Sequence, residues 1–435
     1  MSQGNMKNIF RMNFAIGCFL CTAVLMAQSN DYVATEQIVS KFVSQIEPSI
    51  IEFRRDLHMN PELSNRESRT SKVIAEKLRT LGFDEVKTGV ASTGIVAILR
   101  GGKPGPVVAY RADMDALPIQ ETRSVPYKSR NPGVMHACGH DVHVSIALGI
   151  AETLSKIKDQ ITGTVKFIFQ PAEEGAPDGE EGGAGQMIKE GALENPRPKA
   201  IFGCHVESEI PVGKICLISG PTMASSDDLY IEILGKSAHG AKPHDGIDSI
   251  VVSANVINAL QVIRSRRIDP REGFVLTIGK IQGGTRSNII PEKVEMTGTI
   301  RTLSEKIRKE VPGLVRQTVE GVCSAFGASC SVKINKDYPV TFNDPKLAEE
   351  ILPLLKKIIS SENLFTIKPH TGAEDFSKYQ KVIPGLFFFI GIANMKKNIN
   401  SAIHTSDFDV DETCLAASTR AMSLLLLEYL KNNKI

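Results

Sequence analysis

The sequence predicts an α/β protein in which a compact ferredoxin-like (α+β) domain is inserted into a larger α/β domain. Three observations predict this organisation. Strands and helices alternate through residues 36–220. Residues 221–336 follow the order β-α-β-β-α-β, which is the ferredoxin-like arrangement. The α/β pattern returns in residues 337–435, so the first and last segments should form one discontinuous domain.

The composition is that of an ordinary globular protein. The chain has 435 residues, 42% of them apolar and 23% charged, which is enough for two domains with their own cores. The net charge is +2, with Lys and Arg spread along the chain, so nothing indicates a nucleic-acid partner. We expect small molecules or other protein chains as partners.

Residues 1–27 have the layout of a secretory signal peptide. Lys7 and Arg11 precede an apolar run over residues 14–26, which is too short for a comfortable membrane span. We expect cleavage after Ala27, no membrane attachment afterwards, and export to the periplasm or the medium. A lipoprotein anchor at Cys18 is the alternative, but almost no apolar run precedes that residue.

The first part of the chain predicts helices before any strand. Apolar residues recur at helical spacing over residues 36–57, where Pro48 should restart or kink the helix. A second helix covers residues 68–81 and is ended by Gly82. His58 follows the first helix and is interpreted as a helix-end contact.

Polar groups follow three of the next strands. Strands are predicted at residues 94–99, 107–110, 163–170 and 200–206. Asp113 follows the second of these, Glu173 and Glu174 follow the third, and the fourth ends on His205. Carboxyl ends of parallel strands are where open α/β sheets place their chemistry. A plain acidic loop at Glu173-Glu174 remains the alternative.

Residues 136–143, His-Ala-Cys-Gly-His-Asp-Val-His, concentrate three imidazoles, a thiol and a carboxylate. We place them on a loop that enters a helix, because the apolar rhythm resumes only at Val144. A lone Cys-x-His would be interpreted as part of a buried turn, but Asp141 and His143 beside Cys138 and His140 favour a metal site. The six cysteines after the signal do not form a disulfide scaffold.

Three polar residues stand out in the inserted domain, and a late imidazole in the last segment. His239, Asn288 and Arg301 each follow or end a predicted strand, and each alone is more typical of a surface group. His404 lies in a polar loop before the final helix. Five residues then offer ligands of mixed softness: Cys138, His140, Glu174, His205 and His404. Two divalent ions fit this set better than one, and uncoordinated Glu173 is the candidate general base.

Five motifs carry a family resemblance over nearly the whole mature chain. They are Arg-Ala-Asp-Met-Asp-Ala-Leu-Pro (111–118), His-Ala-Cys-Gly-His-Asp (136–141), Gln-Pro-Ala-Glu-Glu (170–174), Gly-Ala-Glu-Asp-Phe (372–376) and the late His404. The sequence resembles the metal-dependent amidohydrolases that include hippurate hydrolase, bacterial N-acyl-amino-acid amidohydrolases and plant auxin-conjugate hydrolases.

The resemblance implies a zinc-aminopeptidase-like catalytic domain with a ferredoxin-like lid, the five ligands above, and Glu173 as the base. It also implies that His239, Asn288 and Arg301 hold a substrate carboxylate or stabilise the oxyanion. Arg111 stands where a His-x-Asp ligand is usual in the wider superfamily, so Asp113 should be a supporting residue. Cys138 replaces an Asp ligand, which leaves zinc, manganese, nickel and cobalt open.

Three functional hypotheses follow. The first is an exported amidohydrolase that cleaves N-acyl amino acids, and the second is a dipeptidase or carboxypeptidase that acts on peptides or cell-wall fragments. The third is a binding protein that has lost catalysis, and Glu173 argues against it because a binding module has no use for an uncoordinated base. The sequence does not separate the first two. The lid, with its open sheet edge, could also support a homodimer.

Overall fold

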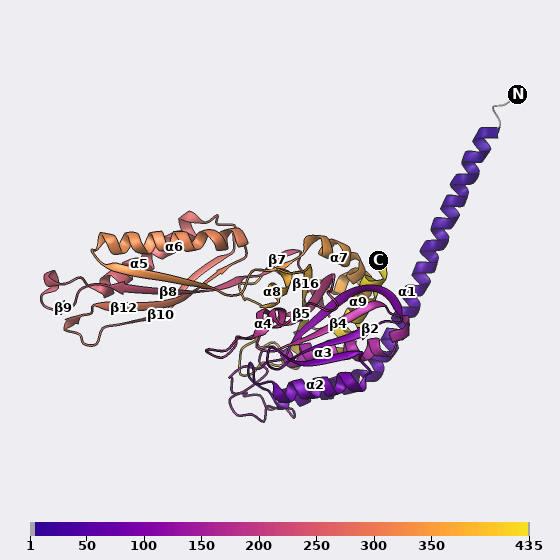
Figure 1. Ribbon diagram of the computed structural model, residues 1–435, viewed down its shortest axis with the longest axis horizontal. Helices are drawn as coiled ribbons and strands as arrows, with labels where there is room; N and C mark the ends of the chain where they lie inside the picture. The colour runs from indigo at the N-terminus through magenta and orange to yellow at the C-terminus, as the bar shows by residue number, and fades with distance from the viewer. Residues whose placement is uncertain (1–4, 434–435) are drawn as a thin grey trace.

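The computed structural model describes residues 5–433 and the side chains from Tyr32 onward. Besides two short two-stranded sheets, it contains a large eight-stranded sheet and a smaller four-stranded sheet, which lie apart along the molecule's long axis (Figure 1). In spatial order the large sheet contains β1 (Glu85–Val90), β2 (Gly94–Arg100), β4 (Thr162–Gln170), β3 (Lys103–Asp113), β5 (Ala200–Pro211), β16 (Gly385–Ala393), β6 (Ile215–Leu217) and β15 (Leu364–Phe365). The predicted α/β class is confirmed.

Four strands at the centre of the large sheet are parallel. β3 pairs in parallel with both β4 and β5, and β16 pairs in parallel with β5. Their carboxyl ends therefore meet at one edge, as the polar residues after the strands predicted. β2 runs antiparallel to β4, and β1, which the sequence did not predict, runs antiparallel to β2.

Helices cover both faces of the large sheet. α1 (Asn5–Met59), α3 (His140–Ser155) and α9 (Thr413–Asn432) contact one another on one face, with α2 (Ser68–Thr80) beside α3 and α7 (Pro345–Ile359) beside α9. α4 (Gly183–Lys189) and α8 (Phe376–Gln380) cover the other face. Side chains of β2 alternate between the two cores: Ile95 and Ala97 face the first, and Val96 faces the second.

The predicted restart of the first helix at Pro48 is wrong, and the alternative, a kink at Pro48, stays a prediction. α1 runs without interruption through Pro48. Val43, Ile46 and Ile50 on either side of the proline are buried against the first core. This packing keeps both halves of the helix in place although Pro48 cannot donate a backbone hydrogen bond.

Of the predicted signal peptide, only the backbone of residues 5–27 is described, as the first part of α1. Residues 1–4 and the side chains before Tyr32 are not described. The cleavage after Ala27 therefore stays a prediction. Among the helices of residues 5–433, none is both long enough and apolar enough to cross a membrane.

The small domain has the predicted order of elements. Along the chain these are β8 (Ser225–Leu234), α5 (Ser249–Val262), β10 (Phe274–Gly283), β12 (Lys293–Thr302), α6 (Glu305–Ala325) and β13 (Ser329–Lys336). The sheet order is β10-β12-β8-β13, all antiparallel, and both helices contribute to the same apolar core. Asp248 and Ser304 accept backbone hydrogen bonds as the caps of α5 and α6.

Candidate active site

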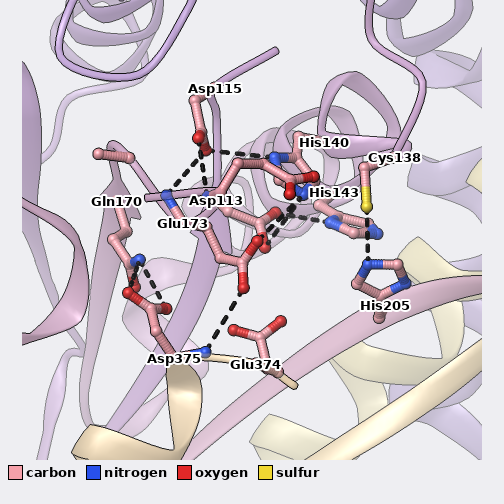
Figure 2. Close-up of polar contacts among 12 residues, drawn as sticks. Asp113, Asp115, Cys138, His140, His143, Gln170, Glu173, His205, Glu374 and Asp375 are labelled. Carbon is pink, nitrogen blue, oxygen red and sulfur yellow. Dashed lines mark hydrogen bonds and ion pairs between the residues drawn. The ribbon is translucent and has the colours of Figure 1, made fainter. Parts of the chain in front are cut away.

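The candidate site lies at the carboxyl edge of the parallel strands. Three strands deliver side chains there: Asp113 ends β3, Glu173 and Glu174 follow β4, and His205 lies in β5. The loop before α3 adds Cys138, and α3 itself adds His140 (Figure 2). His404 enters from the loop before α9.

The structure brings the five predicted ligands together. Cys138 Sγ lies 3.3 Å from Nε2 of His205 and 3.2 Å from Nε2 of His404. Nε2 of His404 is also 3.2 Å from Oε1 of Glu174. Ligand atoms of Cys138, His140 and His205 lie within 4.8 Å of one another, and so do those of Cys138, Glu174 and His404.

The helix begins earlier than the apolar pattern indicated. α3 starts at His140 rather than at Val144, so His140 and His143 are in its first turn. Gly139 precedes it with φ +81°, and a Cβ there would lie 2.4 Å from Cγ2 of Val206. Only glycine fits this left-handed conformation and close approach, and the resulting turn aims Cys138 and His140 at one point.

Two of the imidazoles are held in defined orientations. Nδ1 of His205 donates to the carbonyl of Val206 at 2.6 Å, which leaves the Nε2 lone pair facing Cys138. This is the usual arrangement of a metal-binding histidine. The backbone of His404 is in the left-handed region, with φ 62°, and its N–H donates to the carbonyl of Ala137 at 2.8 Å. Such a conformation is uncommon for a non-glycine residue and clusters at functional sites.

The donor set fits divalent transition metals. Neither ring nitrogen of buried His140 makes a well-aligned hydrogen bond, and neither does Oε1 of Glu174. Burial, followed by the charges of Glu174 and Glu173, raises the pKa of the Cys138 thiol well above its ordinary value. A thiol in this environment ionises only if a positive charge is supplied. Sulfur, imidazole and carboxylate ligands together suit divalent transition-metal ions.

Glu173, the predicted base, is buried beside this cluster. Its Oε2 lies 3.9 Å from Nε2 of His140, and its Oε1 lies 3.4 Å from the backbone nitrogen of Asp375. Burial first, and then the charge of Glu374, raises the pKa of Glu173 well above its ordinary value. A raised carboxyl pKa suits a group that takes up and returns a proton near neutral pH.

Both carboxylate oxygens of Asp113 accept hydrogen bonds from neighbouring side chains. Its Oδ1 accepts from Nδ1 of His143 at 2.6 Å, and its Oδ2 accepts from Arg111 at 2.6 Å. Nε2 of His143 in turn accepts from the backbone N–H of Val206 at 2.9 Å. Asp113 of β3 thus orients His143 of α3, which in turn contacts β5, in keeping with the supporting role expected for Asp113.

Asp115 is a site residue that the sequence reasoning did not single out. Its carboxylate accepts from the backbone N–H groups of Glu173 and Glu174, at 3.0 Å each. It also accepts from Ser64 Oγ at 2.8 Å, and it lies 3.3 Å from Nδ1 of His140. The second Asp of Asp-Met-Asp was the available signal, because it follows the same buried strand as Asp113.

Glu374 and Asp375 were also missed as site residues. Arg111 donates to both carboxylates, at 2.9 and 2.8 Å, and all three side chains are buried. Burial raises the pKa of Glu374 to about 8, although Arg111 opposes the shift. An adjacent acidic pair after a loop, like Glu173-Glu174, was the available signal. Arg111 therefore acts here as a buried counter-ion that ties the late loop to β3.

The three predicted substrate residues do not lie together. Arg301, near the end of β12, lines a cavity of about 540 Å³ together with Cys138, Glu173 and His404. His239 and Asn288 are exposed and lie beside the β9 (Ala238–His239) and β11 (Ile289–Ile290) pair, at the end of the small domain away from the large sheet (Figure 1). Within one chain they take no part in the cavity, because β12 runs back toward the large domain whereas β9 and β11 extend away from it.

Comparisons with known proteins agree with this geometry. The profile of peptidase family M20/M25/M40 matches residues 109–428. Thermostable carboxypeptidase 2 of Saccharolobus solfataricus is 45% identical over 389 residues, which is 89% of this chain and 97% of that protein. An N-acyl-L-amino acid amidohydrolase of Geobacillus stearothermophilus is 41% identical over 309 residues, 71% of this chain and 82% of that protein.

A solved structure is similar over nearly its whole length. It is a Bacillus subtilis protein described as a dinuclear metal binding peptidase, with a TM-score of 0.76 and 35% identity, and the match covers 89% of this chain and 99% of that one.

Proposed function

The chain belongs to peptidase family M20/M25/M40, and from that membership we propose that it cleaves the amide bond of N-acyl amino acids to a carboxylic acid and a free amino acid. Its relatives hydrolyse amide or peptide bonds, so the protein is a hydrolase of that kind. The observation that carries the proposal is the cavity itself, which is lined both by ligand residues together with Glu173 and by Arg301.

The proposed cofactor is a pair of divalent metal ions. Cys138, His140, Glu174, His205 and His404 would hold them, and zinc, manganese, nickel and cobalt all suit these donors. The dinuclear description of the B. subtilis structure supports two ions rather than one. When bound, the ions would polarise the substrate carbonyl and acidify water.

Glu173 is the proposed general base. It accepts a proton from the attacking water while the water oxygen bonds to the amide carbon. It then gives this proton to the leaving nitrogen as the C–N bond breaks, so that a neutral amine departs rather than an anion. The raised pKa of Glu173 supports both steps, because the carboxyl group can hold the proton between them.

Arg301 is the proposed receptor for the substrate carboxylate. Its Nε donates to Oγ1 of Thr299 at 3.1 Å. Among the described residues, none forms an ion pair with its guanidinium group, although several acidic side chains line the same cavity. The two terminal nitrogens can therefore meet a carboxylate as a planar fork.

The alternative is a metallo-dipeptidase or carboxypeptidase that acts on peptides or cell-wall fragments, and the Saccharolobus relative favours it. The test compares substrates that share a C-terminal amino acid and differ only in the group on its nitrogen. Purified protein with added metal is assayed for kcat/KM on N-acetyl, N-benzoyl and aminoacyl derivatives. Higher values for the acyl derivatives support the proposal, and higher values for the dipeptides support the alternative.

Glu173→Gln is the test of the mechanism. This change keeps the shape of the side chain and leaves the ligands intact, so metal content should be unchanged. Turnover should fall by roughly 10²–10⁴, the usual contribution of a general base. A metal-loaded variant that hydrolyses its best substrate at the wild-type rate would show that Glu173 is not the base.

Export is proposed from residues 1–27 alone. The polar and apolar layout of this segment supports it. N-terminal sequencing of protein recovered from the periplasm or medium should begin at or near Gln28. Recovery of the intact N-terminus from the cytoplasm alone would contradict export.

A homodimer through the small domain is also proposed. β10 is an edge strand that exposes Ile281, and the neighbouring α5 exposes Ile250, Val251 and Val262 without one charged residue in the helix. β10 carries one lysine, Lys280, whereas the other edge strand, β13, carries Lys333 and Lys336, and lysines discourage strand pairing. Light scattering should give a dimer mass that Val251→Glu reduces, and a wild-type monomer would rule this interface out.

A further inference from the structure

The small domain is joined to the large one by two chain segments that pair with each other. β7 (Gly220–Met223) and β14 (Thr341–Asn343) form a short antiparallel ladder. Beyond it, the backbone N–H of Ser226 donates to the carbonyl of Tyr338 at 2.9 Å, and the N–H of Asp337 donates to the carbonyl of Ser226 at 3.2 Å. The connection is therefore a hydrogen-bonded joint rather than two loose linkers.

Tyr338 reaches from this joint to the active site. Its hydroxyl donates to the backbone carbonyl of Glu173 at 2.6 Å. The ammonium group of Lys378 lies 4.6 Å from the centre of the Tyr338 ring and 3.4 Å from a carboxylate oxygen of Asp337. The side chain of Tyr338 is thus held by residues of the large domain, whereas the backbone of Tyr338 is part of the joint.

The peptide that carries Glu173 is held by few groups, and each holds the backbone. Asp115 accepts the N–H groups of Glu173 and Glu174 from one side. Tyr338 donates to the Glu173 carbonyl from the other. The Glu173 carboxylate has only longer contacts, at 3.4 and 3.9 Å. The direction of this carboxylate is therefore set mainly by the backbone, and the hydroxyl of Tyr338 is the contact that ties this backbone to the joint.

We infer that Tyr338 is a positioning residue for Glu173. Through the hydrogen bond of the Tyr338 hydroxyl, the orientation of the Glu173 carboxylate depends on how the joint orients the small domain. This inference rests on the proposed function, because it requires Glu173 to be the base. Tyr338 also lines the cavity, so a direct contact with substrate is the competing explanation.

The test is a double-mutant cycle with Tyr338→Phe and Glu173→Gln. Tyr338→Phe removes the hydroxyl and keeps the ring and its contact with Lys378. We expect kcat to fall about tenfold, KM to stay within about twofold, and the melting temperature and metal content to match wild type. In the Glu173→Gln background, assayed at high enzyme concentration, the same change should lower kcat by less than about twofold, because its effect passes through Glu173.

Tyr127→Phe is the matched control. The Tyr127 hydroxyl also donates to a buried partner, Asp409 at 3.2 Å, but it does not line the cavity. Its removal should leave kcat within about twofold of wild type.

Two results would overturn the inference. One is wild-type kcat in Tyr338→Phe. The other is the same fold-loss in both backgrounds, which would assign Tyr338 to direct substrate contact or to general stability. Failure of the proposed function is distinguishable, because Glu173→Gln would then itself turn over at the wild-type rate.

Discussion

Nε of Arg54 lies 2.8 Å from Oδ2 of Asp141, and neither side chain is exposed to solvent. The same carboxylate oxygen accepts from Nδ1 of His58 at 2.8 Å. Arg54 and His58 belong to α1, whereas Asp141 follows His140 at the start of α3. Arg54 also approaches Glu412, just before α9, at 3.4 Å. Two ion pairs of Arg54 thus connect α1 with the beginnings of α3 and α9, next to His140 of the candidate site.

Asp141→Asn should destabilise the protein strongly. The change removes the carboxylate charge that lies nearest to the buried guanidinium of Arg54, and losing one member of a buried pair costs about 3–5 kcal/mol. Thermal or urea unfolding at neutral pH measures the loss. Glu181→Gln is the control, because it breaks an exposed pair with Lys189 and should cost less than about 1 kcal/mol. Equal stability of the Asp141→Asn variant and wild type would contradict the structural role of this pair.

Cys138→Ser should lose at least one bound metal ion. A neutral hydroxyl replaces the thiolate poorly as a ligand, and Cys138 lies at the centre of the predicted ligand set. Elemental analysis and chelator competition measure stoichiometry and affinity. Cys330→Ser, in the small domain, should retain the wild-type metal content. A wild-type protein without bound or restorable transition metal would remove the basis of this prediction.

Arg301→Lys should weaken the binding of substrates that carry a carboxylate. A point charge cannot reproduce the two parallel hydrogen bonds of a guanidinium fork, so KM should rise about tenfold while kcat changes less. Each N-acyl amino acid is assayed beside its carboxamide, which lacks the charge. The carboxamide should be hydrolysed equally well by variant and wild type. A parallel loss on both substrates would show that Arg301 does not select the carboxylate.

Lys166 should make stability depend on alkaline pH. Its ammonium group is buried in β4 and donates to the carbonyls of Ala192 and Glu194, and burial lowers the pKa of Lys166 from 10.5 to about 8. Between pH 8 and 10.5 the unfolded chain therefore binds a proton that the folded chain does not. The free energy of unfolding should rise through this window, and the full penalty, up to about 3 kcal/mol, should be present below pH 8.

The measurement compares wild type with Lys166→Met at pH 7.5 and pH 10. The free energy of unfolding of wild type, relative to that of Lys166→Met, should be higher at pH 10 than at pH 7.5. Exposed Lys199→Met serves as the control and should show no such shift. A pH-independent difference for Lys166→Met would contradict the lowered pKa.

Much of the architecture was predictable because it depends on local patterns. Period-2 and period-3.6 apolar spacing identified the parallel strands, α7 and the elements of the small domain. The predicted family is confirmed. It could be predicted from the sequence because its motifs are short and contiguous. β1 was missed because most of its side chains are exposed and carry no alternating pattern. The start of α3 was missed because tertiary contacts bury His140, Asp141 and His143, which are polar residues that local rules place in loops.

The sequence by itself determined the chemistry that is available: the residue types that can bind metal, the unpaired carboxylate beside them, and the strand ends from which they project. Only the tertiary structure decided which residues cooperate. Asp115 and Tyr338 lie 58 and 165 positions from Glu173, yet both hold its backbone. His239, which the family resemblance grouped with Arg301, lies at the other end of the small domain. Spacing along a chain fixes distances only within one element, whereas these contacts depend on how whole elements pack against one another.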